Sequence, residues 1–364
     1  MGSASRADLA KSLGLSQPTA GKIADELLHL GVFEEVEVPA ENGTRKTGVG
    51  PKLGRPARLL RLTRHKARFL GVQLGVAETS LTPLPLSVDD EEHWSVSFKT
   101  PDNAKDWAKQ LHKAAARISQ KRFWGILVSV PGLLDERKGE VLYSPNLHWT
   151  ETIKLTALIR ESWRAPVILI QEERALAMGH HAADPGGEDF LLMDFGDGVG
   201  GAAMAAGKLH HHLLPIGGEI GHAPIVGNPR KCGCGAVGCL ETLTSTRGLL
   251  ESFAAASSLP RPSWKALSQS VAENGVEPWL AETFNITAAT IACAVNVLGL
   301  RRVVITGSIT ELAPAAFEYL SAAIKRGSLW ARFGELKVES APRRRKAGLV
   351  AAGIDRLIVP VGDS

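Results

Sequence analysis

Two short segments, two-thirds of the way along the chain, decide its fold: Glu219-Ile-Gly-His222 and Cys232-Gly-Cys234-Gly-Ala-Val-Gly-Cys239-Leu-Glu241. They hold three of the four cysteines beside one histidine and two acids. Three thiolates and one imidazole make a complete tetrahedral ligand set for structural zinc. The three glycines among the cysteines leave few apolar groups to pack and suit tight turns. A bound metal would hold such a loop in place.

Length and composition indicate a globular protein of more than one domain. The chain has 364 residues, of which 44% are hydrophobic and 22% charged. Its N-terminus lacks the pattern of a signal peptide, and we expect no membrane-spanning segment. Four cysteines do not make a disulfide framework at this length, and we expect Cys293, in an apolar stretch, to be buried. We therefore predict a cytoplasmic protein.

The charge of the chain is uneven. Residues 1–68 hold 12 Lys and Arg against 7 Asp and Glu, whereas residues 69–364 hold 30 against 31. Nine basic residues and no acid fall within 43–68. This asymmetry indicates a basic module for a polyanion, attached to a near-neutral domain. A solvated run of charge is the alternative.

The first thirty residues have the pattern of a helix-turn-helix. Ser5-x-x-Asp8 is a capping box for a short helix that ends at Gly14, and Ser16 caps a longer helix with Pro18 in its first turn. The longer helix has the spacing of one buried face at Ala20, Ile23, Leu27 and Leu30. Its exposed start offers groups that suit base edges and phosphates in a major groove. These candidate DNA-binding residues are Gln17, Thr19, Gly21 and Lys22.

A candidate β-hairpin wing follows the two helices. Its strands would lie at 32–38 and 58–62, with Gly54-Arg55-Pro56 at the base and Arg55 against the DNA. A winged helix normally has a first helix packed beneath these two, and only four residues precede Ser5. We therefore predict a winged helix-turn-helix that lacks its first helix. A helical hairpin used for protein contacts is the alternative.

From Phe69 onward, predicted strands and helices alternate. Apolar stretches predict strands at 69–74, 123–130, 167–170, 190–195 and 302–306. Amphipathic patterns predict helices at 103–119 and 151–163. Alternation of this kind is typical of an α/β chain, here with more than one sheet.

These features together resemble the ROK family (repressor, open reading frame, kinase), a branch of the sugar-kinase/actin-like ATPase fold. The two segments quoted first are the most specific part of the resemblance, which covers nearly the whole chain. Further similar segments are Val130-Pro-Gly-Leu-Leu-Asp135, Ser144-Pro-Asn-Leu-His-Trp149 and Ala347-Gly-Leu-Val-Ala-Ala352. The resemblance implies a DNA-binding domain at 1–68 and a two-lobed, ribonuclease H-like domain at 69–364, with lobes of about 69–180 and 181–364.

The resemblance also assigns roles to the two segments. It implies a structural zinc bound by His222, Cys232, Cys234 and Cys239. It further implies that Glu219, His222 and Glu241 hydrogen-bond sugar hydroxyls, a role that suits carboxylates and imidazole. If one nitrogen of His222 binds zinc, the other is left as a donor toward the ligand. A zinc ribbon without a sugar ligand is the alternative.

The loops that a ROK kinase uses to hold phosphate are altered in this chain. In the first loop, at 71–78, Gln73, Val76 and Ala77 replace the acid, second glycine and threonine of the family pattern, and Glu78 adds a negative charge. Each change disfavours ATP or its magnesium. The second loop, Gly196-Asp-Gly-Val-Gly-Gly201, keeps its glycines, although its aspartate would repel phosphate. We interpret it as a glycine turn retained for the fold, with a working nucleotide site as the alternative.

The position of the catalytic base is altered too. The family motif Glu-Asn-Asp-Ala-Asn matches Ile170-Gln-Glu-Glu-Arg174, so the base position becomes Glu172 and the neighbouring Asn becomes Gln171. Each side chain is one methylene longer, and a misplacement of about 1 Å can slow catalysis by roughly a hundredfold. We predict no catalytic residue, and add Gln171 and Glu172 to the predicted sugar-binding set.

The sequence therefore predicts a sugar-responsive, DNA-binding transcriptional regulator, a repressor, with operator DNA and a sugar or sugar derivative as partners. Two-fold operators imply a homodimer or homotetramer. An ATP-dependent ROK sugar kinase with a regulatory N-terminus is one alternative. A DNA-binding regulator that has lost its ligand response is the other.

Overall fold

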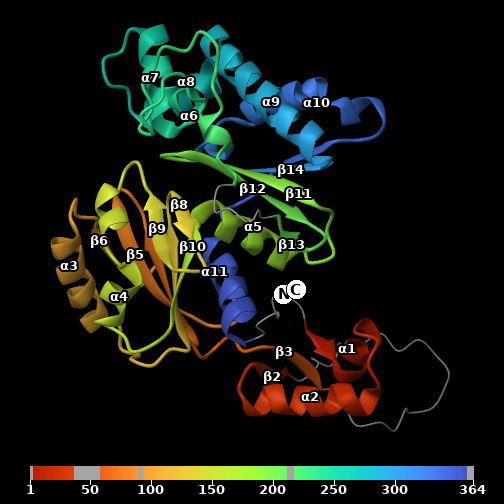
Figure 1. Ribbon diagram of the computed structural model, residues 1–364. Coiled ribbons are helices and arrows are strands. Elements are labelled where there is room, and N and C mark those ends of the chain that lie inside the picture. Colours follow the sequence, from red (N-terminus) through yellow and green to blue (C-terminus); the bar gives the residue numbers. More distant parts are fainter. Residues whose placement is uncertain (1–2, 37–57, 89–92, 211–216, 359–364) are drawn as a thin grey trace.

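A computed structural model describes residues 3–36, 58–88, 93–210 and 217–358 of the chain. An N-terminal unit lies at one end, and two α/β lobes, each built on a five-stranded sheet, are stacked beyond it (Figure 1). Two helices lie between the sheets of the lobes (Figure 1). The predicted combination of a helical N-terminal unit with a two-lobed α/β domain is confirmed.

The N-terminal unit contains two helices and a three-stranded sheet. Helix α1 (Arg6–Ser12) has a complete capping box between Ser5 and Asp8, and the Ser16 side chain caps α2 (Gln17–His29), as predicted. The strands are β1 (Ala4–Ser5), β2 (Phe33–Val36) and β3 (Leu59–Leu62), with β3 in the middle and both pairings antiparallel. Helix, turn, helix and hairpin thus occur in the predicted order, while the wing residues 37–57 lie outside the described residues.

The predicted buried face of α2 is only partly correct. Ala20 and Ala24 are buried, but Ile23 and Leu30 are 44% and 53% exposed. The spacing of apolar residues was right for a helix, but the described part of the N-terminal unit places no helix over those two side chains. Leu27, in contrast, packs against the core that joins this unit to the rest of the chain.

The first lobe is built on a mixed sheet in the order β10-β7-β4-β5-β6. Strands β4, β7 and β10 are parallel, and β4, β5 and β6 form an antiparallel meander. Trp107 and Leu111 of α3 are buried in the core of this lobe. Its elements are β4 (Phe69–Leu74), β5 (Glu78–Leu84), β6 (Val96–Lys99), α3 (Ala104–Arg117), β7 (Gly125–Val130), β8 (Leu133–Asp135), β9 (Glu140–Tyr143), η1 (His148–Thr152), α4 (Leu155–Arg160) and β10 (Val167–Gln171).

The second lobe repeats this topology. Its sheet has the order β13-β12-β11-β14-β15, again an antiparallel meander beside parallel strands. Repetition of one topology in two lobes is the arrangement expected for an actin-like, ribonuclease H-like fold. The elements are β11 (Phe190–Phe195), β12 (Val199–Ala205), β13 (Lys208–Leu209), η2 (Ile220–His222), α6 (Glu241–Thr244), α7 (Thr246–Ser257), α8 (Trp264–Asn274), α9 (Pro278–Leu298), β14 (Arg302–Gly307), η3 (Ser308–Glu311), α10 (Pro314–Gly327), η4 (Leu329–Arg332) and β15 (Lys337–Ser340).

Helix α9 corrects two expectations. By length and composition alone it could cross a membrane, which we had not expected of any segment. Phe284, Ile291 and Val295 nevertheless lie in the core of the second lobe, so that α9 is a core helix there. Cys293 is exposed, not buried, because the helix turns that side chain away from the core. An apolar run does not show which of its residues face inward.

Helices α5 (Glu172–Ala183) and α11 (Arg345–Gly353) cross between the two sheets (Figure 1). Their backbones touch at two glycines. A Cβ on Gly348 would lie 1.6 Å from the Ala175 carbonyl oxygen, and one on Gly179 would lie 1.9 Å from that of Arg344. No larger residue fits such a crossing without moving one of the helices.

One apolar cluster joins the N-terminal unit to the first lobe. Val32 is buried in it together with Phe69, Leu86 and Leu349 of α11. Further members lie in the π-helical turn η5 (Ile354–Ile358), which continues α11 toward the N-terminal unit (Figure 1). Arg68 strengthens the junction, because its guanidinium donates to the Gly31 carbonyl at 2.9 Å and lies 4.5 Å from the centre of the Trp124 ring. Helix α11 thus has one end between the lobes and the other near the N-terminal unit.

Candidate functional site

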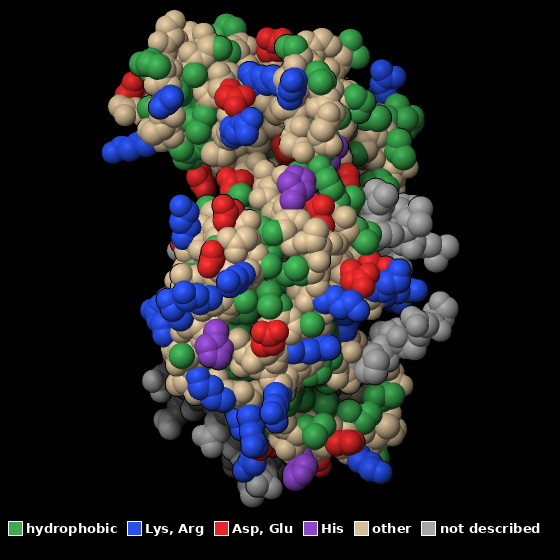
Figure 2. Space-filling model, turned by 60° about the vertical axis from the view of Figure 1, so that its left-hand side comes forward, with side chains coloured by type: hydrophobic (Ala, Val, Ile, Leu, Met, Phe, Trp, Pro, Cys, Tyr) green, Lys and Arg blue, Asp and Glu red, His purple; other side chains and the backbone are tan. Residues whose placement is uncertain are grey.

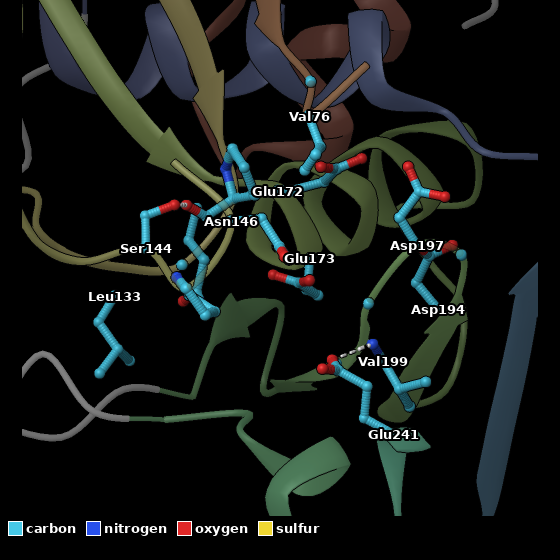
Figure 3. Close-up of a pocket in the computed structure, with 18 of the residues that line it drawn as sticks. Val76, Leu133, Ser144, Asn146, Glu172, Glu173, Asp194, Asp197, Val199 and Glu241 are labelled. Atoms are coloured by element: carbon cyan, nitrogen blue, oxygen red, sulfur yellow. Dashed lines mark hydrogen bonds between the residues drawn. The ribbon is translucent and has the colours of Figure 1, made fainter. Parts of the chain in front are cut away.

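A polar cleft separates the two lobes and leaves a volume of about 180 Å³ accessible to water. Strand ends and turns of both lobes line it (Figure 3). The first lobe contributes Gln73, Val76, Asn146 and the start of α5, and the second lobe contributes the turn after β11 and the segment around Glu219. Ligands bind at such carboxyl ends of strands in many α/β folds. This cleft is the candidate ligand site.

The four predicted metal ligands lie at one end of the cleft. Their ligand atoms, from His222, Cys232, Cys234 and Cys239, all fall within 4.8 Å of one another. The Cys234 and Cys239 sulfurs are 3.6 Å apart, as are the Cys232 sulfur and His222 Nδ1. Ligands about 2.3 Å from one tetrahedral zinc would lie about 3.8 Å apart. The predicted structural zinc site is confirmed as a matching set of ligands in a matching arrangement.

Glycines shape the loop that carries the cysteines. Gly235 and Gly238 adopt φ values of +91° and +89°, where other residues are strained. Cys232 and Cys239 are buried, and Cys234 is half-buried. The chain can therefore fold back on itself twice within eight residues and bring the three sulfurs together.

The five predicted sugar-binding residues all line the cleft: Gln171, Glu172, Glu219, His222 and Glu241. His222 directs Nδ1 toward Cys232 and Nε2 toward Glu219, 3.6 Å from a carboxylate oxygen. One ring nitrogen thus faces the cysteines and the other faces the Glu219 carboxylate. This is the arrangement expected of a histidine that is shared between a metal and a ligand. Gln171 donates to Glu219 at 3.0 Å across the cleft, and this contact joins the two lobes.

The surroundings of Glu219 shift its pKa, and those of Glu241 fix its position. Burial raises the pKa of Glu219, against the opposing influence of His222 and of the Gln171 hydrogen bond. Glu241 accepts a hydrogen bond from the Val199 backbone at 3.0 Å, which fixes the carboxylate beside the turn after β11 (Figure 3). Its other oxygen lies 3.7 Å from the Cys232 sulfur. Glu241 therefore connects the metal cluster to the floor of the cleft.

The other end of the cleft holds two ion pairs that we did not predict. Arg343 binds the carboxylate of Asp194 through two bonds of 2.7 and 2.9 Å, and donates to the Phe195 carbonyl at 3.1 Å. Arg345 pairs with Glu172 at the catalytic base position. Both arginines belong to the run Arg343-Arg344-Arg345, whose last residue begins α11. Three adjacent arginines are a visible signal in the sequence, but nothing in it indicates partners some 150 residues away.

Glu173 is a further cleft residue that the sequence analysis did not single out. Burial, followed by repulsion from Glu172, raises its pKa to about 8. Its Oε2 has no hydrogen-bond partner among the described residues. The carboxyl packs against Gly200, where a Cβ would lie 2.7 Å from Oε1. The glycine at this position in the turn thus makes room for a carboxyl that is neutral at pH 7.

The altered first loop faces the cleft only in part. Gln73, Gly75 and Val76 line it, and the Val76 side chain points inward (Figure 3). Ala77 and Glu78 are exposed outside the lining. The aspartate of the second loop, Asp197, is exposed at the tip of its turn (Figure 3).

The predicted DNA-binding residues lie at the start of α2. Gln17, Thr19 and Lys22 are exposed, and Gly21 is half-buried with no atom within 4 Å of where its Cβ would be. The Thr19 hydroxyl lies 2.7 Å from that of the capping Ser16. Arg55 lies outside the described residues.

Several arginines of the N-terminal unit are engaged within it. Arg6 pairs with Asp25 and Glu35, Arg58 pairs with Glu35, and Arg61 with Glu34. Lys and Arg are nevertheless more numerous on the lower part of the molecule, toward the N-terminal unit, than on the upper lobe (Figure 2).

Curated relatives of the chain include bacterial repressors. It is 28% identical over 256 residues to the xylose repressor of Caldicellulosiruptor bescii, with 68% of this chain and 61% of that protein covered. It is 26% identical over 329 residues to the transcriptional dual regulator NagC of Escherichia coli, with 85% and 78% covered. The chain thus spans less than two thirds of the length of the xylose repressors.

Solved structures share the fold. A ROK family transcriptional regulator described as a homologue of the E. coli MLC protein superposes with a TM-score of 0.75 at 21% identity, covering 98% of this chain and 93% of that one. A ROK family glucokinase from Streptomyces griseus, in complex with glucose and AMPPNP, gives 0.59 at 22% identity, covering 78% and 97%. The model of the ROK family matches residues 69–353. The chain belongs to the ROK family.

Proposed function

We propose that this protein is a sugar-responsive, DNA-binding transcriptional repressor whose cleft binds a sugar without phosphorylating it. The observation that carries the proposal is the pairing of two features in one chain. A cleft whose hydrogen-bonding groups suit a sugar lies beside the four metal ligands. A single apolar cluster connects the first lobe, which forms one wall of that cleft, with the helix-turn-helix unit. The relatives named as repressors support it.

The metal-cluster end of the cleft supports sugar binding. Glu219, His222 and Glu241 offer acceptors and one nitrogen within a small space, and a sugar presents hydroxyls that both donate and accept. Zinc bound at the four ligands would fix the orientation of His222, as outer ligands fix the tautomer of metal-bound imidazoles. Its role there is structural, and the residues around it would contact the sugar.

Sugar kinase activity is the second candidate, because ROK hexokinases and glucokinases share the fold. Against it stands Glu172, whose carboxylate is already engaged in an ion pair with Arg345. Val76 also points a branched side chain into the cleft where a kinase loop would bring backbone close to phosphate (Figure 3). We propose that the kinase site is degenerate.

Helix α11 is the element through which the cleft would act on DNA. It starts at the Arg345–Glu172 pair, crosses α5 at Gly348, and continues into η5 beside the N-terminal unit. A ligand that favours one lobe arrangement would move this helix as a rigid body. In a homodimer or homotetramer acting in the cytoplasm, that movement would change the spacing of paired α2 helices on an operator.

Gly21 supports contact between α2 and DNA. A glycine inside a helix destabilises it by about 1 kcal/mol relative to alanine, and the fold leaves open space at this position. An outside surface that approaches the helix backbone would explain the residue. Gly21→Ala should raise the melting temperature slightly and weaken binding to the DNA upstream of the gene by about tenfold, as measured by fluorescence anisotropy. Unchanged DNA binding would argue against this contact.

The ligand-binding part of the proposal is tested by thermal shift. Xylose, glucose and N-acetylglucosamine are added to the zinc-loaded protein, and one of them should raise its melting temperature. The shift should vanish in Glu219→Ala and Glu241→Ala and persist in Glu335→Ala, an exposed position away from the cleft. A phosphorylated sugar formed from ATP at ordinary kinase rates would contradict the proposal.

A further inference from the structure

We infer that the sugar bound by this cleft carries no phosphate or other negative charge, because the cleft already neutralises its own cations. The inference rests on the proposed function and specifies the ligand class of the same site. Three observations support it: the excess of carboxyl groups in the cleft, the ion pairs that hold Arg343 and Arg345, and the carboxyl groups beside the backbone N–H donors.

Carboxyl groups outnumber cations in the cleft. Six carboxyl groups line it, and the only Lys or Arg residues among the described lining are Arg343 and Arg345. These acids are Glu172, Glu173, Asp194, Asp197, Glu219 and Glu241. An anionic ligand would have to enter a field that is net negative even with Glu173 protonated, and like charges in a partly buried site repel strongly.

Arg343 is held where a ligand phosphate would need it. Its guanidinium donates to the two carboxylate oxygens of Asp194 through Nε and Nη2. Asp194 is 6% exposed and also accepts from the Thr306 hydroxyl at 2.6 Å. The guanidinium also fills the glycine turns around it. An added Cβ would lie 2.5 Å from Arg343 Nη2 at Gly196 and 2.7 Å from it at Gly307. Drawing Arg343 toward a phosphate would leave the Asp194 carboxylate buried and unpaired, which is strongly unfavourable.

Arg345 is held in the same way. Its side chain is 11% exposed and pairs with Glu172, whose side chain is 18% exposed. Drawing it away would place an unpaired carboxylate at the first turn of α5, beside Glu173. Both arginines thus complete ion pairs within the protein and have little capacity left for an incoming anion.

The backbone positions that bind phosphate in other proteins lie beside carboxyl groups here. The N-terminus of α5 carries Glu172 and Glu173 in its first turn, which places acidic side chains at the positive end of the helix. In the turn after β11, Gly196 donates to the Gly198 carbonyl and Val199 to Glu241. The exposed Asp197 adds a negative charge at the same turn. A neutral sugar needs none of these donors, since the metal-cluster end supplies its partners.

The experiment compares neutral sugars with their phosphate esters on the zinc-loaded full chain. Isothermal titration is run with glucose and glucose 6-phosphate, with N-acetylglucosamine and its 6-phosphate, and with pyrophosphate. We expect a neutral sugar to bind, its phosphate ester to bind at least about a hundredfold more weakly, and pyrophosphate not to bind. A phosphate ester that binds as tightly as its neutral sugar, or more tightly, overturns the inference.

Two variants keep the result interpretable. Asp197→Asn removes one exposed charge from the cleft and should narrow the ratio between neutral sugar and ester by about threefold to tenfold. Glu335→Gln removes one exposed charge outside the cleft and should leave the ratio unchanged. Equal ratios in both variants would contradict the electrostatic account.

Failure of the proposed function gives a different result. If no neutral sugar and no ester binds, the proposed function fails for these sugars. The titration with pyrophosphate then shows whether the cleft accepts an anion at all. Binding of pyrophosphate that disappears in Arg343→Gln would show that this arginine accepts anions, and would overturn the inference. Absence of pyrophosphate binding upholds it.

Discussion

The two ends of the interlobe cleft differ in whether their carboxylates are paired with an arginine of the protein. At the metal-cluster end, His222 and Glu219 line the cleft, and among the described residues Glu219 forms no ion pair with a Lys or Arg. At the other end, Asp194 and Glu172 are satisfied by Arg343 and Arg345. Under the proposed function, the first end recognises the ligand, and the ion pairs at the other end occupy the groups that chemistry on phosphate would use.

If the proposed function holds, recognition and catalysis in such a cleft are separable. Two ion pairs would then be enough to occupy one end of the cleft while the sheets that form it keep their order. The glycine turn after β11 persists although Arg343 fills the space beside it.

The largest expected effect comes from breaking the metal-cluster end. Cys232→Ser removes a buried ligand, and zinc bound to such sites contributes about 10 kcal/mol or more of folding free energy. Bound zinc, measured by plasma mass spectrometry, should fall from about one per chain to near zero. The melting temperature should fall by at least about 5 °C.

A second cysteine provides the matched control for that experiment. Cys293 is exposed on α9, away from the cluster, so Cys293→Ser should change neither zinc content nor melting temperature. Full zinc content in Cys232→Ser would show that the cluster is not the metal site.

The next largest effect concerns α5 and α11, the two helices that cross between the lobes. Gly348→Ala would place a methyl group 1.6 Å from the Ala175 carbonyl oxygen, so α5 and α11 would have to separate. The free energy of unfolding in urea should fall by about 3 kcal/mol. Gly186→Ala, at a glycine with nothing within 4 Å, should change it by less than about 0.5 kcal/mol. Similar values for the two variants would refute the close crossing.

The smallest effect concerns Glu173 and the pH dependence of the free energy of unfolding. Burial raises the pKa of Glu173 from 4.5 to about 8, so between these pH values the folded chain holds a proton that the unfolded chain releases. The folded state then binds more protons, and stability must fall as pH rises through this window. Glu173→Gln removes this slope. Relative to the native chain, the variant should gain at least about 1 kcal/mol between pH 5 and pH 8.5.

That prediction is checked with urea unfolding curves at the two pH values. Parallel pH profiles for the native chain and the variant would mean that Glu173 titrates normally. Glu318→Gln, outside the cleft lining, serves as the control and should follow the native profile.

The zinc ligands and the fold could be predicted because they are encoded locally. The spacing of His222 and the three cysteines is a property of two short segments, and the caps at Ser5 and Ser16 act on the helices that follow them. Alternating apolar runs were sufficient to predict an α/β chain with more than one sheet, and the family resemblance implied the two lobes. Each of these signals depends on residues close together in the chain.

The catalytic end could not be predicted, because its contacts join distant segments. Arg343 meets Asp194 only when β15, the strand before α11, pairs with β14, which in turn pairs with β11. The raised pKa of Glu173 depends on burial, which the sequence does not display. The exposure of Ile23 and Cys293 likewise depends on what packs against each helix. Sequence patterns identify an apolar residue, and the tertiary fold decides whether it is covered.

The most direct test of the central claim measures DNA affinity with and without sugar. The zinc-loaded chain is titrated against a labelled fragment of the DNA upstream of its gene, and the sugar that gave the thermal shift is then added at saturation. The account predicts that the sugar weakens DNA binding at least fivefold, a coupling of about 1 kcal/mol, and that Glu219→Ala abolishes the effect. DNA affinity that is the same with and without a bound sugar would contradict it.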